Sequence, residues 1–333
     1  MTLQKAWFSN AKWVWVLLPL TLVFCLLSFC RRVLYRLGLK SAYRCRAFVI
    51  VVGNISVGGN GKTPAVISIV KRLHDQGYSC GVLSRGYGGS QREFPCLVTS
   101  ASSAQVVGDE PTLMAHRLPC PVVIDPKRAR GAKFLADELG CDVIICDDGL
   151  QHYALQRDFE IVVMDNRLVG NSFLLPMGPL RESTKRLKSV DAIVFNTTNN
   201  IESLSAKLGL DTSLSCSQML LQPTRWINVK SNELGDNLIA KNATALAGIG
   251  DPNRFFSTLK SMNIRVEKEI PFSDHHDYMK SDLPNGKVLM TEKDAVKVRN
   301  FAHDDCWYLE VEGLIDETLF ILLKTRLDEF FNA

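Results

Sequence analysis

Short apolar runs alternate with helical stretches from Ala47 onward. The runs are continuous, with no polar residue at every second position, which is typical of strands buried on both faces of a parallel sheet. The strands predicted in this part of the chain are 48–52, 79–84, 121–125, 142–146, 160–165 and 191–195. Helical stretches such as 64–76 and 128–139 lie between them, so the order predicts an open α/β sheet with helices on both faces.

A second strand-and-helix pattern follows a polar stretch, 199–242, that we expect to be irregular. Its predicted strands are 244–249, 265–270, 287–291 and 307–311. A helix is expected to start with Asp251 as N-cap and Pro252 as first helical residue, and residues 254–262 continue it. Residues 317–331 are amphipathic and predict a last helix. We therefore expect a nucleotide-binding domain over 45–214, a smaller α/β domain over 215–315, and a C-terminal helix over 316–333 that packs back on the core.

The N-terminus contains an uncharged apolar run over residues 13–30. Its length is near the minimum for a membrane-spanning helix. Pro19 in the middle of the run would kink a helix, so a re-entrant or interfacial helix is the alternative. A cleaved signal peptide would need small residues after the run, whereas Phe-Cys-Arg-Arg stands there. We expect residues 1–44 to form a membrane anchor.

Basic residues follow the apolar run closely, at Arg31, Arg32, Arg36, Lys40, Arg44 and Arg46. Such a cluster suits the anionic cytoplasmic face of a membrane, although a solvated helix face would also show it. The net charge of the whole chain is only +4. We therefore expect a membrane surface as partner, with no nucleic acid and no obligate protein partner. The ten cysteines form no CxxC pair, which favours buried free thiols in a reducing compartment over disulfides or a metal site.

A glycine-rich loop follows the first predicted strand and leads into a predicted helix. It contains, in a row, Gly58, Gly59, Asn60, Gly61, Lys62 and Thr63. Backbone N–H groups of such a loop surround nucleotide phosphates, and the helix N-terminus adds partial positive charge. Lys62 would reach the β- and γ-phosphates, and the Thr63 hydroxyl would bind Mg²⁺. Ser56 stands where the strict pattern has glycine, and a connecting loop without function is the alternative.

Asp147 and Asp148 follow the apolar run 142–146 directly. A carboxylate at the end of a neighbouring parallel strand is where phosphate-loop enzymes hold Mg²⁺. Adjacent side chains of an extended backbone point to opposite sides, so one acid would serve the metal and the other a loop or the substrate. An ordinary Asp-Asp-Gly turn is the alternative.

Two further segments contain candidates for a general base. Asp109 stands in a loop with Glu110 and would accept a proton from an attacking hydroxyl; a solvated first turn of a helix is the alternative. His275 stands in a second polar segment, Phe272-Ser273-Asp274-His275-His276-Asp277-Tyr278. A histidine beside a carboxylate can tune or orient a base, whereas a helix capped by Asp274 is slightly favoured by the pattern alone.

Taken together, the motifs resemble the tetraacyldisaccharide 4'-kinase family, the lipid A 4'-kinases. Seven blocks occur in family order between about residues 45 and 297, which makes the resemblance specific. The blocks are Gly58-Gly59-Asn60-Gly61-Lys62-Thr63-Pro64 with Gly53-Asn54 before it, Ser84-Arg85-Gly86-Tyr87-Gly88, Val107-Gly108-Asp109-Glu110-Pro111, Asp147-Asp148-Gly149-Leu150-Gln151-His152, Gly178-Pro179-Leu180-Arg181-Glu182, Asp274-His275-His276 and Thr291-Glu292-Lys293-Asp294-Ala295-Val296-Lys297. Ser56 is compatible with this family, whose loop is a variant of the strict pattern.

The resemblance implies a phosphate-loop fold and transfer of the ATP γ-phosphate to the 4'-hydroxyl of tetraacyldisaccharide 1-phosphate, giving lipid IVA. It implies ATP and Mg²⁺ as cofactors, a lipid as substrate, and a place on the cytoplasmic face of the inner membrane. Asp109 is then the expected base, helped by His275. Thr63 is expected to bind Mg²⁺, and Asp147 and Asp148 are expected to serve the metal and the phosphoryl group. The expected substrate-side groups are Arg85, Gln151, Arg181 and Glu182.

Two other functions are compatible with a phosphate loop near a membrane. A GTPase switch needs an Asn-Lys-x-Asp motif at a strand end, but Thr197 follows Asn196. A transport ATPase would hydrolyse ATP without a small acceptor. Nucleotide competition and dependence on the lipid acceptor would separate these functions from a kinase.

Overall fold

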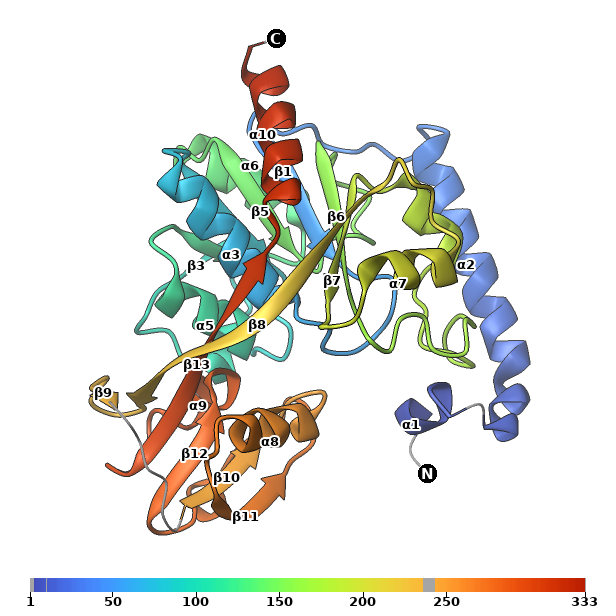
Figure 1. Cartoon of the computed structure of the whole chain (residues 1–333). Coiled ribbons are helices and arrows are strands. Elements are labelled where there is room, and N and C mark those ends of the chain that lie inside the picture. The colour runs from blue at the N-terminus through green and yellow to red at the C-terminus, as the bar shows by residue number, and fades with distance from the viewer. Residues whose placement is uncertain (1–2, 10, 236–242, 333) are drawn as a thin grey trace. The chain divides into compact units, whose positions relative to one another are not determined.

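The computed structural model describes residues 3–9, 11–235 and 243–332 and divides the chain into two compact units (Figure 1). The first unit comprises Met1–Leu83, Lys127–Leu220 and Leu314–Ala333, and the second comprises Ser84–Pro126 and Leu221–Gly313. This division differs from the one expected from the sequence. The segment Ser84–Pro126 lies inside the expected domain 45–214, yet it groups with the second unit.

A parallel sheet forms the core of the first unit. Its strands are β1 (Phe48–Gly53), β2 (Cys80–Ser84), β5 (Val143–Asp147), β6 (Phe159–Asp165), β7 (Ala192–Asn196) and the first part of β8 (Ser215–Asn228), in the order β8-β7-β6-β1-β5-β2. Each neighbouring pair runs parallel. Every residue of β1 is buried, which explains why its sequence is apolar without alternation. The α/β fold expected from the sequence is confirmed.

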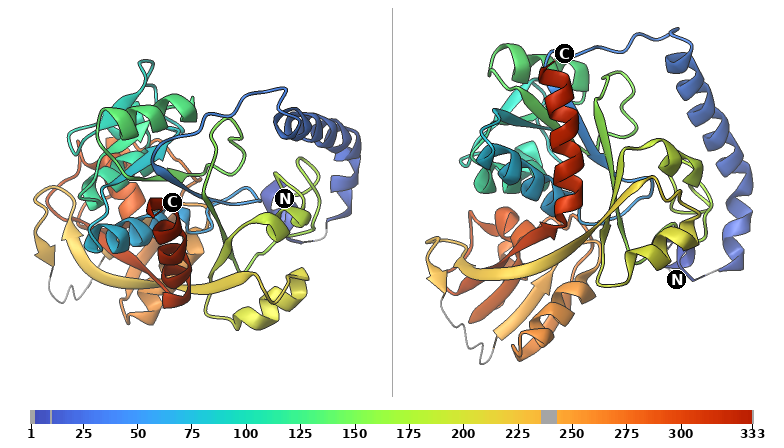
Figure 2. Two further views of the ribbon diagram at one scale, coloured as in Figure 1. Left: turned by 90° about the horizontal axis from the view of Figure 1, so that it is seen from above. Right: turned by 45° about the horizontal axis from the view of Figure 1, so that its top comes forward.

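Helices accompany this sheet. They are α3 (Lys62–Asp75), α6 (Arg128–Asp137), the 3₁₀ helix η2 (Thr184–Ser189), α7 (Ile201–Leu208) and α10 (Glu317–Phe331). The last of them, α10, lies beside α3 (Figure 2), where Arg72 forms an ion pair with Glu317. The ring of Phe330 also packs edge-on against Phe48 of β1 at 5.2 Å. The C-terminal helix therefore packs on the central strand of the first unit.

The expectation that 199–242 is irregular is wrong for the described residues of that range. Asn200 caps α7, because its side chain accepts a hydrogen bond from the Ser203 amide at 2.9 Å. The 14 residues of β8 follow, and buried side chains such as Ser217 and Met219 alternate there with less buried ones. A strand with one buried and one more exposed face carries many polar residues. The composition of β8 is therefore similar to that of a loop. Residues 236–242 lie outside the described part of the chain.

The second unit contains a parallel sheet of its own. Its strands are β10 (Ala243–Ala247), β11 (Val266–Pro271), β12 (Lys287–Thr291) and β13 (Cys306–Ile315), and its helices include α8 (Pro252–Ser261), α9 (Glu292–Val298) and the 3₁₀ helix η3 (Lys280–Asp282). The short β9 (Leu234–Gly235) pairs antiparallel with the end of β8. Pro252 begins α8 as expected, but Asp251 makes no capping hydrogen bond through its side chain.

The inserted segment of the second unit adds α4 (Ala104–Val107), α5 (Asp109–Arg117), β3 (Cys96–Val98) and β4 (Val122–Ile124). The strand β3 was missed in the sequence, because only three residues form it. It pairs antiparallel with β4, whereas the neighbouring strands of the first unit all pair parallel.

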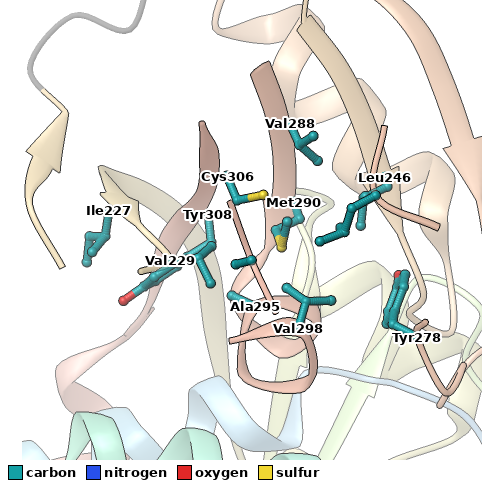
Figure 3. Close-up of a cluster of buried hydrophobic side chains, with 12 residues drawn as sticks. Ile227, Val229, Leu246, Tyr278, Val288, Met290, Ala295, Val298, Cys306 and Tyr308 are labelled. Atoms are coloured by element: carbon teal, nitrogen blue, oxygen red, sulfur yellow. The ribbon is translucent and has the colours of Figure 1, made fainter. Parts of the chain in front are cut away.

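Two hydrophobic cores cover the two faces of the second sheet. Leu246, Val288 and Met290 belong to one core, together with Tyr278 and Tyr308 (Figure 3). Their neighbours along the strands, Ala245 and Leu289 among them, belong to the other core, which includes Phe255 and Phe256 of α8. Successive residues of a strand face opposite sides, so one run of apolar residues serves both cores.

The N-terminal segment comprises α1 (Leu3–Trp7), the 3₁₀ helix η1 (Lys12–Leu17) and α2 (Leu18–Arg36). Pro19 lies in the first turn of α2, where a missing N–H is tolerated, so the expected kink in mid-helix is absent. Lys12–Arg36 is long and apolar enough to cross a membrane, by length and composition. Val14 and Thr21 of this segment are buried against the rest of the first unit: Val14 packs in a cluster with Met177, and the Thr21 hydroxyl accepts a hydrogen bond from the Met177 amide at 3.1 Å.

Candidate functional site

The glycine-rich loop connects β1 to α3, as the sequence predicted. Gly58 and Gly61 have positive φ angles of 115° and 91°, which glycine adopts readily. Gly61 also has a neighbour that excludes a side chain: a Cβ atom there would lie 2.2 Å from Nδ2 of Asn196. That amide donates a 3.0 Å hydrogen bond to the carbonyl of Asn60. The loop therefore has a defined conformation at the start of α3.

Lys62 and Arg181 both approach Asp148. The ammonium of Lys62 lies 3.7 Å from one carboxylate oxygen, and Arg181 donates to the other at 2.8 Å. Asp148 has a positive φ of 49°, which turns the chain directly after β5. Burial opposes ionisation of this carboxyl, but the two cations outweigh it and lower the pKa of Asp148. Two positive groups therefore meet around an ionised carboxylate beside the loop.

The predicted substrate-side residues of the first unit form a connected group. Gln151 lies 3.4 Å from Arg181 and donates a 2.8 Å hydrogen bond to Glu182. Glu182 is buried and also accepts a 2.6 Å hydrogen bond from the hydroxyl of Tyr153. Burial and then the charge of Glu182 raise the pKa of Tyr153. Glu182 thus orients Gln151 next to Arg181, and its role as a substrate-side group stays a prediction.

Asp147 and Thr63 lie on the two elements that flank the loop. Asp147 ends β5 with 1% of its surface exposed, and it is paired in register with Val52, the last residue but one of β1. Thr63 lies in the first turn of α3. Asp148 is more exposed than Asp147, so the two acids differ in environment. The buried Arg128, which belongs to none of the seven blocks, donates to the main-chain carbonyl of Asp147 at 2.6 Å.

A second group of charged residues lies within the second unit. Nδ1 of His275 is 3.0 Å from Oδ2 of Asp109, the first residue of α5. The Asp109 side chain is only 8% exposed, so the alternative of a solvated helix turn is wrong for this residue. His275 has a φ of 57° and lies in a turn, so the helix capped by Asp274 is wrong as well. The next residue, His276, pairs with Asp282 instead.

Two lysines that received no role from the sequence also approach Asp109. Lys293 and Lys297 stand four residues apart on α9, which places them on one face of the helix. Their ammonium groups lie 3.7 and 3.9 Å from Oδ2 of Asp109. Lys293 also lies 3.5 Å from Nε2 of His275 and 3.3 Å from Glu110. Their place in the block from Thr291 to Lys297, four residues apart, was the signal that could have identified them.

The charges around Asp109 determine its protonation. Burial opposes ionisation, but the hydrogen bond from His275 and the charges of Lys293 and Lys297 lower the pKa of Asp109 to about 2. The same hydrogen bond raises the pKa of His275, against burial and the charge of Lys293. Asp109 is therefore ionised at neutral pH. The remaining candidate of this unit, Arg85, is exposed in the segment after β2, and the structure does not group it with Gln151, Arg181 and Glu182, which belong to the first unit.

The parallel sheet and its loop define a class, the phosphate-loop nucleotide-binding α/β proteins. The family model described as "Tetraacyldisaccharide-1-P 4'-kinase" matches residues 13–328 of the chain. The chain therefore belongs to the tetraacyldisaccharide 4'-kinase family, and the resemblance expected from the seven blocks is confirmed.

Individual relatives agree with this assignment. The tetraacyldisaccharide 4'-kinase of Pseudoalteromonas atlantica is 52% identical over 314 residues, which cover 93% of this chain and 99% of the relative. That of Haemophilus influenzae is 45% identical over 316 residues, covering 93% and 92%. A crystal structure of LpxK from Aquifex aeolicus in complex with ATP superimposes with a TM-score of 0.81 at 29% identity, covering 95% of this chain and 100% of that one.

Proposed function

We propose that this kinase transfers the γ-phosphate of ATP to the 4'-hydroxyl of tetraacyldisaccharide 1-phosphate, giving lipid IVA in lipid A biosynthesis. The observation that carries the proposal is the arrangement of Lys62 and Arg181 on Asp148 beside the phosphate loop. Family membership and the ATP complex of the Aquifex aeolicus relative point to the same activity. The GTPase and transport ATPase alternatives have no comparable support.

The first unit binds and orients the nucleotide in this proposal. Loop amides from Gly58 to Thr63 surround the phosphates, and Lys62 neutralises charge on the group being transferred. Arg181 supplies a second cation near the same group, oriented by Gln151 and Asp148. Phosphoryl transfer depends chiefly on positioning and charge neutralisation, so these preorganised cations would supply much of the rate.

The residues next to the loop fit Mg²⁺. Mg²⁺ prefers hard oxygen ligands and usually takes one or two from the protein, the rest coming from phosphates and water. The Thr63 hydroxyl and the Asp147 carboxylate are oxygen donors of this kind, on α3 and at the end of β5. A bound Mg²⁺ would neutralise phosphate charge. Among the described residues no group of three or more His, Cys, Asp or Glu side chains could hold a metal ion.

The second unit supplies the base. Asp109 accepts the proton of the 4'-hydroxyl as that oxygen forms its bond to the γ-phosphorus, and the bond between this phosphorus and the bridging oxygen of ADP breaks. His275 orients the carboxylate through its 3.0 Å hydrogen bond. An aspartate with a pKa of about 2 is a weak base. Its contribution therefore lies in accepting a proton late in the reaction, when the attacking oxygen has become acidic.

The N-terminal helix brings the enzyme to its lipid substrate. Several apolar side chains of α2 are exposed, and basic residues follow them. This arrangement fits an anchor in the inner membrane with the catalytic units on the cytoplasmic face, where ATP is available.

A coupled assay of ADP release tests this function against its alternatives. We expect ADP release from the purified chain with ATP and Mg²⁺ only when tetraacyldisaccharide 1-phosphate is present. Equal release without the lipid would favour a transport ATPase. Stronger inhibition by GDP than by ADP would favour a GTPase.

A further inference from the structure

Two side chains from outside the motif contact the phosphate loop. Arg167 follows β6 and Asn196 ends β7, the two parallel strands beside β1 on one side of the sheet. Parallel strands end at the same edge of a sheet, so these residues reach the loop from its flank. Neither residue belongs to the seven blocks.

Arg167 contacts the middle of the loop. Its Nη2 donates to the carbonyl of Gly59 at 3.0 Å and to Oδ1 of Asn60 at 2.7 Å. The guanidinium also lies against Gly58, since a Cβ atom there would be 3.4 Å from Nη1. Asn60 in turn donates to the hydroxyl of Ser56 at 3.2 Å. A single cation thus ties together the glycines and the buried asparagine.

The orientation of Arg167 is fixed from two further sides. Asp165, the last residue of β6, accepts from Nε at Oδ1 (3.1 Å) and from Nη2 at Oδ2 (2.6 Å), which is a bidentate pair. The ring of Phe8 lies 5.5 Å from the guanidinium carbon on another side. A lysine at this position could not make the same fork of hydrogen bonds.

Asn196 contacts the last part of the loop. Its Nδ2 donates to the carbonyl of Asn60 at 3.0 Å and occupies the space beside Gly61 that a side chain would need. Arg167 and Asn196 therefore bind the carbonyls of Gly59 and Asn60, and Arg167 also binds the side chain of Asn60. Carbonyls that are bound in this way turn outward, so that the amides between them are left to face phosphate.

We propose that Arg167 and Asn196 are positioning residues that preorganise the phosphate loop for ATP. The inference rests on the proposed function, because it assumes that the loop binds the nucleotide. Preorganisation lowers the cost of ordering the loop on binding, so the loss of either residue weakens nucleotide affinity. The lipid acceptor makes no use of this contact, and its KM is unaffected.

The test is binding of a fluorescent ATP analogue to the purified full chain without lipid, followed by steady-state kinetics. We expect Arg167→Met and Asn196→Ala to weaken binding about tenfold, the usual size for lost hydrogen bonds to a charged group. The KM for ATP should rise in parallel while that for the lipid stays constant. Arg167→Lys, which keeps the charge and loses the fork, should lie between wild type and Arg167→Met.

Arg72→Met is the matched control. Arg72 lies on α3 of the same unit at an exposed place, where its Nη2 donates to both carboxylate oxygens of Glu317, at 2.7 and 2.6 Å. It should bind the analogue like wild type. Wild-type affinity in Arg167→Met, or equal weakening in Arg72→Met, would overturn the inference and leave the kinase function standing. A wild-type chain that binds no ATP analogue would overturn the proposed function itself.

Discussion

The imidazole Nδ1 of His275 lies 3.0 Å from the carboxylate Oδ2 of Asp109, although 166 positions separate them in the chain. One residue begins α5 and the other lies in a turn with positive φ. Both belong to the second compact unit, so the pair exists within a single unit. A histidine hydrogen-bonded to a buried aspartate is a suitable arrangement for proton transfer.

Asp109→Asn should lower kcat by about 10²–10⁴-fold, the usual contribution of a general base. The amide keeps the shape of the carboxylate but cannot accept the proton from the hydroxyl. Steady-state kinetics with the lipid acceptor measures the loss. Asp304→Asn is the control, because Asp304 is exposed and pairs with Lys230 elsewhere in the same unit. Unchanged turnover in Asp109→Asn would remove Asp109 as base.

The titration of His275 should respond in opposite directions to two substitutions. The hydrogen bond that His275 donates to Asp109 raises the pKa of His275 above its usual 6.5, whereas the charge of Lys293 lowers this pKa. Asp109→Asn should therefore move the midpoint down, and Lys293→Met should move it up. NMR of the chain with ¹³C-labelled histidine, assigned with His275→Gln, measures both.

The control for this titration is Lys260→Met, which removes an exposed lysine paired with Glu269. It should leave the His275 midpoint in place. A midpoint that moves down in Lys293→Met would contradict the electrostatic account of this site.

Gly61→Ala should abolish ATP binding, whereas Gly77→Ala should not. Both glycines have a φ near 90°, so both variants bear similar backbone strain of about 1–2 kcal/mol. A methyl group at Gly61 would meet Asn196 at 2.2 Å, but at Gly77 nothing lies within 4 Å. Calorimetric titration with an ATP analogue separates collision from strain. Adding Asn196→Ala to Gly61→Ala should restore part of the affinity. Equal ATP affinity in Gly61→Ala and Gly77→Ala would contradict the loop geometry.

Leu26→Lys should release the chain from membranes. Leu26 lies in α2 with 62% of its surface exposed. A lysine in the centre of an inserted helix costs about 2.5–3.5 kcal/mol. Sedimentation with vesicles containing anionic phospholipid measures the bound fraction. Ile321→Lys is the control, because Ile321 is equally exposed, at 66%, but lies on α10; equal release by both variants would argue against α2 as anchor.

The sequence predicted the buried strands of the first unit to within about two residues, because continuous apolar runs bounded by glycine and polar residues have few other folds. It failed at β8, where side chains of a long strand alternate between buried and partly exposed positions and thus lower its apolar content. It failed at β3 because three residues carry too little pattern. The grouping of Ser84–Pro126 with the second unit depends on packing between distant segments, which no local pattern contains.

The candidate site divides in the same way. Lys62, Asp148 and Arg181 each belong to a motif, and the structure brings them together around one carboxylate. The roles we give them stay predictions. Arg167 and Asn196 belong to no motif, since they reach the loop only through the order of strands β7, β6 and β1. Residues that support a site from neighbouring strands are found by geometry and seldom by sequence pattern.

The central claim is transfer of phosphate to the 4'-hydroxyl of the lipid disaccharide. The most direct measurement is incubation of the purified chain with ATP, Mg²⁺ and tetraacyldisaccharide 1-phosphate, followed by mass spectrometry of the lipid. The account predicts a product that has gained one phosphate group, located at the 4'-position by fragmentation, and no product with Lys62→Ala. A lipid of unchanged mass, while ATP is consumed, would contradict it.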